Sequence, residues 1–279
     1  MPHEIGFLQN TGTLAHYMML DKIKTFAEAN GYTILRYDVV SANRELIMKA
    51  PGYSGTEEIF IGFRTYHNVS SDYYNLTVAV FTGYVPGNTF ATQPGALLSG
   101  VPAHNNRIDY WLTLNPQRIA LVMKVGTPVY EAAYAGKFNK YAFNSQFPYP
   151  VAVGGMLNGE ATTRFSDTTH GIPYKGNRAN MRMRFNDGVW KQVLCHPWDN
   201  ADIAGSTYST RDTNNSYPLE PVILKDAQGL YGELDGIFQI SGFNNATENT
   251  LVDAGITYVV FQDVSRNGFN DYFAMRLDA

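Results

Sequence analysis

Short segments in which apolar and polar residues alternate, divided by turn-forming residues, limit what this chain can fold into. Alternation with a period of two places every second side chain on one face, as in a half-buried strand. In residues 58–65, for example, Ile59, Ile61 and Phe63 share a face. The pattern predicts an antiparallel meander early in the chain, with strands at residues 33–39, 44–49, 58–65 and 73–84.

A long loop and then a hairpin are expected after the meander. Residues 85–107 are punctuated by glycine and proline, which is typical of irregular chain. Residues 108–114 and 118–125 are apolar and flank Asn115-Pro116-Gln117, a turn sequence. The sequence therefore predicts a two-stranded hairpin over residues 108–125.

Two helices are predicted around these strands. Residues 11–30 carry apolar side chains at helical spacing, and Asn30-Gly31 provides a left-handed stop. Residues 127–136 have helix boundary signals, with Thr127 as N-cap, Pro128 at the first helical position and Gly136 as the end. Helix, meander and helix together indicate an α+β fold in which both helices cover one face of a sheet.

From about residue 149 the sequence is β-rich, with long loops. Turn dipeptides such as Asn158-Gly159 and Asp187-Gly188 separate short strand-like segments. We expect strands at residues 181–185, 189–194, 236–241, 257–263 and 272–277. The expected division is an α+β domain over residues 1–148 and a β-rich domain over residues 149–279. The second half could also complete the first sheet instead of standing alone.

The overall composition restricts the function classes. The 279 residues carry a net charge of −4 and form no basic stripe, so we expect no direct binding to nucleic acid or to membrane surfaces. The single cysteine, Cys195, excludes a disulfide framework within the chain. The first residues resemble no signal peptide, and the longest apolar runs are far shorter than the roughly 20 residues that cross a bilayer.

Residues suited to catalysis or metal binding form no recognisable motif. Cys195 and His196 are a nucleophile beside a base, but neighbours on a strand point to opposite faces, so a buried structural cysteine is expected. The six histidines show no metal-ligand spacing. Asp263 to Gly268 begins like a calcium loop, yet its twelfth position is Ala274 where the ion needs a glutamate. We expect instead a hairpin that turns at Asn267-Gly268.

Paired carboxylates are equally weak signals. Glu57 and Glu58, and likewise Glu233 and Asp235, could serve a glycosidase, but solvated or turn-capping roles are expected. Residues 52–55 fall one residue short of the nucleophile elbow of hydrolases. The sequence therefore predicts no catalytic, cofactor-binding or metal-binding residue, and no cofactor.

Aromatic residues in a charge-poor chain favour a binding or assembly role. Charged residues make up 16% of the chain, against about 25% in soluble domains. Tyrosine covers a large contact area with few torsions to freeze, which suits permanent interfaces. The best contact candidates are the loops 85–107 and 197–219 and the aromatic residues Tyr73, Tyr74, Tyr84, Phe90, Tyr149, Tyr217 and Phe243.

Several segments, in order along nearly the whole chain, resemble a family of virion structural proteins of tailed bacteriophages. They are residues 54–62, 81–87, 93–95, 146–155, 231–236, 241–245 and 271–277. The resemblance implies a non-enzymatic tail or virion component, and it assigns no functional residue.

On this basis we expect a subunit of the tail or baseplate, located in the virion. Its expected partners are other virion proteins and further copies of itself in a symmetric ring. Three alternatives stay open: a neck or tail-terminator ring protein, a host-surface or glycan-binding module that uses clustered aromatic residues, and a cell-wall hydrolase.

Overall fold

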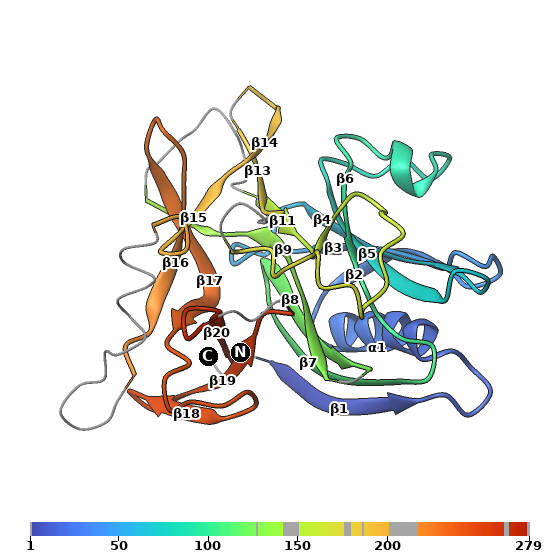
Figure 1. Cartoon of the computed structure of the whole chain (residues 1–279). Helices are drawn as coiled ribbons and strands as arrows, with labels where there is room; N and C mark the ends of the chain where they lie inside the picture. The colour runs from blue at the N-terminus through green and yellow to red at the C-terminus, as the bar shows by residue number, and fades with distance from the viewer. Residues whose placement is uncertain are drawn as a thin grey trace.

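The computed structural model describes residues 2–126, 128–141, 151–175, 180–185, 187–200, 217–264 and 268–277 (Figure 1). The fold is mostly β, with 50% of the residues in strands and 7% in helical structure. A single α-helix, α1 (Ala15–Ala29), is present in the part of the chain so described. The predicted α+β class with two helices is therefore wrong.

Three antiparallel sheets build the molecule. Sheet A has the order β1-β7-β8-β9-β11-β13-β14, sheet B the order β12-β6-β5-β4-β3-β2, and sheet C the order β15-β16-β17-β20-β19-β18, with β10 also paired to β17. The strands of sheet A are β1 (His3–Gln9), β7 (Arg107–Asn115), β8 (Arg118–Val125), β9 (Val129–Lys137), β11 (Val151–Gly154), β13 (Arg182–Arg184) and β14 (Trp190–Gln192).

The other two sheets draw on different parts of the chain. The strands of sheet B are β2 (Thr33–Asp38), β3 (Glu45–Ala50), β4 (Ile59–Asn68), β5 (Tyr73–Phe81), β6 (Leu97–Val101) and β12 (Leu157–Asn158). Those of sheet C are β10 (Asn139–Lys140), β15 (Leu194–His196), β16 (Glu220–Lys225), β17 (Leu230–Ile240), β18 (Thr250–Asp253), β19 (Ile256–Gln262) and β20 (Tyr272–Arg276).

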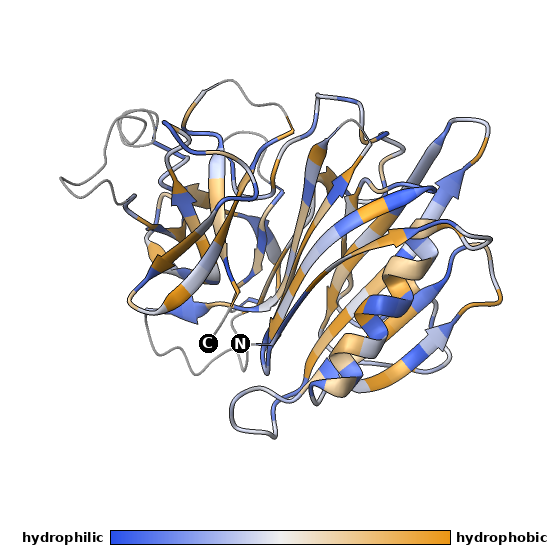
Figure 2. Ribbon diagram, turned by 90° about the horizontal axis from the view of Figure 1, so that it is seen from below, coloured by the Kyte–Doolittle hydropathy of each residue, from blue (hydrophilic) through white to orange (hydrophobic). Residues whose placement is uncertain are grey.

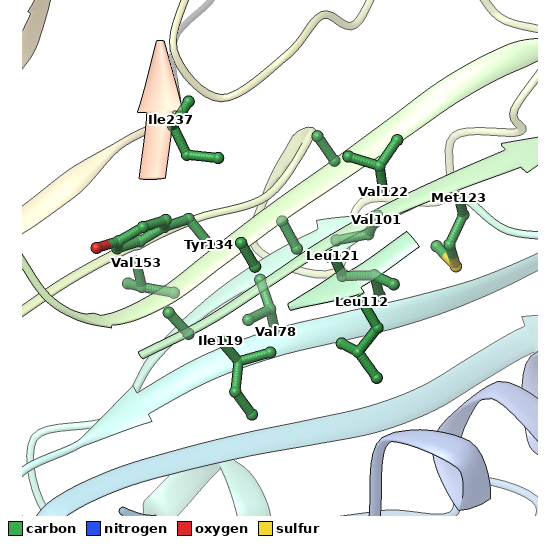
Figure 3. Close-up of a cluster of buried hydrophobic side chains, with 14 of the residues drawn as sticks. Val78, Val101, Leu112, Ile119, Leu121, Val122, Met123, Tyr134, Val153 and Ile237 are labelled. Carbon is green, nitrogen blue, oxygen red and sulfur yellow. The ribbon is translucent and has the colours of Figure 1, made fainter. Parts of the chain in front are cut away.

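Sheet A is the middle layer of the molecule. Strands β4, β5 and β6 of sheet B contact β9 of sheet A. On the other face of sheet A, the ring of Trp111 in β7 lies 5.0 Å from that of Phe261 in β19. Figure 3 shows one cluster with residues of all three sheets, including Val78 from sheet B, Leu121 from sheet A and Ile237 from sheet C.

The helix closes one side between sheets A and B. It contacts β1 and β7 of sheet A and also β2, β4 and β5 of sheet B. Its buried side chains recur at helical spacing and are Ala15, His16, Met19, Leu20, Ile23 and Ala27. Figure 2 shows α1 from this side, lying against the strands. The predicted helix over residues 11–30 is confirmed, although it begins four residues later.

Burial on both faces explains the composition of the middle strands. In β8 every residue except Lys124 is buried, and the run from Ile119 to Met123 is wholly apolar. A strand covered on both faces has no polar side to present, so its sequence is a continuous apolar run without alternation. The predicted hairpin over residues 108–125 is confirmed, since β7 pairs with β8 around the turn at Asn115.

The second predicted helix is the strand β9. Residues 127–136 carry helix boundary signals, but β9 pairs with β8 on one edge and with β11 on the other. These pairings bury Tyr130 to Gly136 between two layers, which outweighs the local helix preference of its alanines. Gly136 does not end a helix. Its φ of 123° and its close approach to the backbone of Gln117 require a residue without a side chain.

Other predictions for the chain had mixed outcomes. The meander strands are confirmed as β2 to β5. The loop predicted over residues 85–107 contains a short 3₁₀-helix (Phe90–Thr92) and β6, so that prediction was wrong in part. Strands β1, β10, β11, β12, β16 and β18 were not predicted as strands. Pro221 interrupts the pattern of β16, whereas β1 carries apolar residues at the alternate positions 5 and 7 and was missed.

Strands on either side of residue 148 pair with one another. Sheet A runs from β9 to β11 and β13, and β12 pairs with β6 in sheet B. Strand β10 pairs with β17 in sheet C. The β-rich second half thus contributes strands to all three sheets.

Candidate functional site

A buried arginine links sheet A to sheet C. Arg118 in β8 is completely buried, and its Nη1 donates a hydrogen bond of 2.7 Å to the Thr113 hydroxyl. Its Nε lies 3.6 Å from the Asp235 carboxylate of β17, which also accepts a hydrogen bond from the side chain of Asn115. Gly236 leaves room for the guanidinium, since a Cβ there would lie 2.5 Å from Nη2. Asp235, one of the candidate catalytic carboxylates, therefore balances an internal charge.

A second buried pair lies in the same layer. Nε2 of His170 is 3.1 Å from both carboxylate oxygens of Glu131 in β9, and both side chains are buried. Burial raises the pKa of Glu131 to about 7, against the opposing effect of His170. Burial alone would lower the pKa of His170, but the hydrogen bond and charge of Glu131 raise it above its ordinary value. Sequence reasoning missed this pair because 39 residues separate its members.

Asp263, the first residue of the segment that resembles a calcium loop, is engaged by a lysine and a backbone N–H. Asp263 accepts hydrogen bonds from the Ile172 backbone N–H at 2.8 Å and from Lys175 Nζ at 3.1 Å. The same ammonium lies 2.5 Å from a carboxylate oxygen of Asp271. The expected hairpin is confirmed, since β19 pairs with β20, while Asn267 of its turn lies outside the described residues. The two aspartates hold loop 171–175 against sheet C.

The neighbours Cys195 and His196 do not act together. Cys195 is buried, and burial raises the pKa of its thiol. Nδ1 of His196 lies 3.0 Å from the carboxylate of Asp199, which also pairs with Lys225 at 2.8 Å. The cysteine is therefore a buried core residue and the histidine part of a partly exposed ion-pair group.

The remaining candidate carboxylates are separately engaged. Glu57 pairs with Lys137 at 2.9 Å, and Glu58 lies 3.5 Å from Lys49. Glu233 accepts a hydrogen bond of 3.3 Å from the Tyr141 hydroxyl. In these contacts each carboxylate has a different partner. Residues 52–55 form a turn whose Gly52 N–H donates to the carbonyl of Pro116.

The candidate aromatic residues do not line one cleft. Tyr74 and Phe90 are buried, and Phe90 packs on Phe81 in sheet B. The hydroxyl of Tyr84 donates to the Leu35 carbonyl, and that of Tyr217 donates to the Phe243 carbonyl. Tyr73 is half-buried beside Tyr66. Tyr149 and most of the loop 197–219 lie outside the described residues.

The described surface includes two shallow hollows that contain charged side chains. The larger, of about 510 Å³, is lined by residues that include His104, Arg107 and Lys124. Its charges are compensated, because Arg107 pairs with Asp109 at 2.7 Å and Lys124 with Glu248 at 2.6 Å. Both cations of this hollow are therefore engaged by carboxylates of the same chain.

The smaller hollow, of about 370 Å³, lies beside α1 and includes Tyr17 and Arg44 in its lining. The Arg44 guanidinium stacks 3.9 Å from the centre of the Tyr17 ring, and His16 lies behind that ring. Both ring nitrogens of His16 lack a hydrogen-bond partner among the described residues. Burial, with the charges of His67 and Arg44, lowers its pKa to about 3, so the ring is neutral.

Three of the places that expose large apolar side chains lie at strand edges and hairpin turns. The first is the edge strand β1, where Ile5 is 50% and Phe7 60% exposed. The second is the pair of hairpin turns at one end of sheet B, with Val40 and Val69. The third is the group of Val189, Leu230 and Tyr141, near the turns of the β13–β14 and β16–β17 hairpins (Figure 1).

These surfaces are the candidate functional site. Exposed apolar side chains gathered at strand edges and turns mark contacts with other proteins more often than scattered single ones do. Sequence reasoning missed Ile5 and Phe7, although their alternate positions in His3-Glu4-Ile5-Gly6-Phe7-Leu8 were a usable signal.

No protein-family model matches the chain, and no curated protein matches it significantly. Among the residues that the structure describes, no group of three or more His, Cys, Asp and Glu side chains is arranged to hold a metal ion. In the same residues, no helix is both long and apolar enough to cross a membrane.

Proposed function

We propose that this chain is a structural subunit of a tailed-bacteriophage virion, in the tail or baseplate, which holds its neighbours in register. The observation that carries the proposal is the exposure of large apolar side chains on three separate surfaces, with Phe7, Val40 and Leu230 as examples. A subunit in a closed ring needs different surfaces for its two neighbours, and a further one for the next layer.

The rigidity of the interior supports the same function. Sheets A and C are joined by the Arg118–Asp235 pair, and loop 171–175 is bound to sheet C through Lys175. The candidate catalytic carboxylates Glu57 and Asp235 serve such internal contacts. Satisfied buried polar contacts of this kind rigidify a core, which suits a subunit that holds its neighbours in register.

The resemblance of the sequence to virion structural proteins supplies the biological setting. A neck or tail-terminator ring protein stays the alternative within this class. Both are assembly roles, and they differ in the part of the particle that contains the chain.

The test is mass spectrometry of purified particles from a phage that encodes the chain, followed by electron microscopy with a label on the chain. We expect a stoichiometric component at the distal end of the tail. A label at the head-proximal end would favour the neck alternative. Absence of the chain from complete, infectious particles would contradict the proposal.

A further inference from the structure

Strand β1 is an exposed sheet edge without the usual protection. It pairs with β7 over seven consecutive residues, with no register shift. It contains no proline or lysine, and Ile5 and Phe7 are exposed on one face. No strand pairs with its other edge among the described residues. A long, regular, apolar edge of this kind is a template for another strand.

The other sheet edges are protected. Strands β14 and β15 have three residues each, and β12 has two. Strand β2 is irregular between Ile34 and Arg36, and the Tyr84 hydroxyl covers it by donating to the Leu35 carbonyl. Strand β18 has four residues and ends in Asp253. Short length, bulges, charge and cover are the common ways to block edge pairing. Strand β1 is the exception.

Two hydrogen bonds that flank β1 show which backbone groups are free. Leu114 N–H donates to the Pro2 carbonyl, and Asn10 N–H donates to the Asn106 carbonyl. In an antiparallel pair, successive residues alternate between the two edges of the strand. Even-numbered residues of β1 therefore face β7. The N–H and C=O groups of His3, Ile5, Phe7 and Gln9 face the open edge.

We propose that this edge pairs with β1 of a second copy of the chain, in an antiparallel register centred on Gly6. The inference rests on the proposed function and names one of the neighbours that the subunit holds. Because the contact is two-fold, this copy lies in the next layer and not beside the subunit in its own ring. In this register Ile5 lies opposite Phe7 of the other copy, and His3 lies opposite Gln9. Each of the four free residues then forms a doubly hydrogen-bonded pair.

The self-complementarity of the strand favours a second copy as the occupant. The register places two apolar cross-strand pairs on the exposed face, where a β-branched residue meets an aromatic one. Moving the centre to Ile5 would place Phe7 opposite His3 and leave Gln9 without a strand residue to pair with. A shift by one residue is excluded, because it would place Ile5 and Phe7 of the two copies on opposite faces of the joined sheet.

The new apolar surface would be continuous with the core. Ile5 lies opposite Trp111 of β7, and Trp111 packs on Phe261 of sheet C. The other face of β1 is already engaged, because Glu4 binds Lys22 of α1 at 2.8 Å and Leu8 is buried. Pairing would therefore extend sheet A, the middle layer, through both copies.

The first experiment measures the native mass of the whole chain and its variants by light scattering after size exclusion. We expect the wild type at an even multiple of 31.1 kDa, and Phe7→Lys at half the wild-type mass. A lysine on an edge strand opposes pairing, and here it would face Asp109 of its own chain. Ile5→Pro should have the same effect, since it removes an N–H that faces the open edge and adds no charge.

The matched control is Val252→Lys on the edge strand β18, where Val252 is 71% exposed. It should keep the wild-type mass. Circular dichroism and the melting temperature show whether each variant is folded, and either Phe7→Lys or Ile5→Pro suffices for the test.

The second experiment tests the register by disulfide formation. Ile5→Cys and Phe7→Cys proteins are mixed and oxidised, and each is also oxidised alone. The mixture should cross-link severalfold more than either protein alone, because residue 5 lies opposite residue 7 of the other copy. The native Cys195 is buried and does not compete. Mixed Val252→Cys and Phe7→Cys proteins should not cross-link.

Each other outcome overturns a specific statement. A monomeric wild type, or variants that keep the wild-type mass, would refute self-pairing through β1, and the presence of the chain in virions would still support the proposed function. Equal cross-linking in all mixtures would refute the register. A chain that dimerises through β1 but is absent from particles would refute the proposed function and leave this inference intact.

Discussion

Strands β8 and β1 belong to the same sheet and differ in what covers them. Strand β8 has a neighbour on each edge and a layer on each face, and its one completely buried charge, Arg118, is paired. Strand β1 has a neighbour on one edge, and its outer face exposes Ile5 and Phe7. The fold of one chain accounts for the apolar residues of β8. It does not account for Ile5 and Phe7 of β1, which fit a contact with another protein.

The contrast predicts that interior changes cost stability, whereas changes at the β1 edge cost association. The largest effect is expected for Arg118→Met, which leaves the Asp235 carboxylate buried without its cation. Breaking a buried ion pair from one side typically costs about 3–5 kcal/mol. Denaturant unfolding measures this loss in the free energy of unfolding. The control Lys49→Met breaks the more exposed pair with Glu58 and should cost about 0–1 kcal/mol. Equal costs would show that Arg118 is not a structural link.

Gly136→Ala should be the next most damaging change. The residue has a φ of 123°, and a Cβ would lie 2.3 Å from the Gln117 carbonyl oxygen. Strain at such a position costs on the order of 1–3 kcal/mol. Thermal unfolding should show a lower melting temperature for Gly136→Ala. Gly87→Ala, where a Cβ meets nothing within 4 Å, should change stability by about 0.5 kcal/mol or less. Similar melting temperatures for both variants would contradict the placement of β9.

The Glu131–His170 pair should make interior stability depend on pH. Both pKa values are raised in the folded protein, so the folded state binds protons more tightly than the unfolded chain does. The pair's contribution to the free energy of unfolding is therefore complete below pH 4.5 and decreases as the pH rises toward about 7 and beyond. Glu131→Gln should remove this slope, and because burial then lowers the pKa of His170, the stability of the variant should rise with pH.

Unfolding free energies of wild type and Glu131→Gln, measured between pH 4.5 and 8, test the prediction. The wild type should lose on the order of 1–3 kcal/mol relative to the variant across this range. Glu58→Gln, a change at an exposed carboxylate, serves as the control. A wild type that gains stability relative to Glu131→Gln as the pH rises would show that the pair is stabilised by its deprotonated form instead.

The smallest effect on folding is expected at the β1 edge. Phe7→Ser removes an exposed ring. The Cζ atom of Arg107 lies 4.6 Å from the centre of this ring. We expect a change in the unfolding free energy of the isolated subunit of about 0.5 kcal/mol or less. Chemical denaturation at a concentration where the subunit is monomeric measures it. A loss as large as that of Arg118→Met would mean that Phe7 belongs to the core.

The comparison also explains what the sequence could and could not predict. The helix over residues 15–29 and the hairpin over residues 107–125 depend on nearby residues, and their local patterns were sufficient. Strand β9 has the local pattern of a helix, and only its pairing with β8 and β11 makes it a strand. No local signal indicates that a segment will lie between two layers.

The candidate site was less accessible to sequence reasoning than the fold. Buried pairs such as Glu131–His170 and Lys175–Asp263 join residues far apart in the chain. The aromatic residues in loops were expected at the surface, but Phe90 is completely buried. The exposed edge is visible only once β7 is known to occupy the other side of β1.

Hydrogen–deuterium exchange at single-residue resolution tests the open edge most directly. In the assembled wild type, the amides of Ile5, Phe7 and Gln9 should exchange slowly. In Phe7→Lys the amides of Ile5 and Gln9 should exchange rapidly, while those of Gly6 and Leu8, which face β7, stay protected. Rapid exchange at Ile5 and Gln9 in the wild type would mean that no second strand binds there, and would contradict the account.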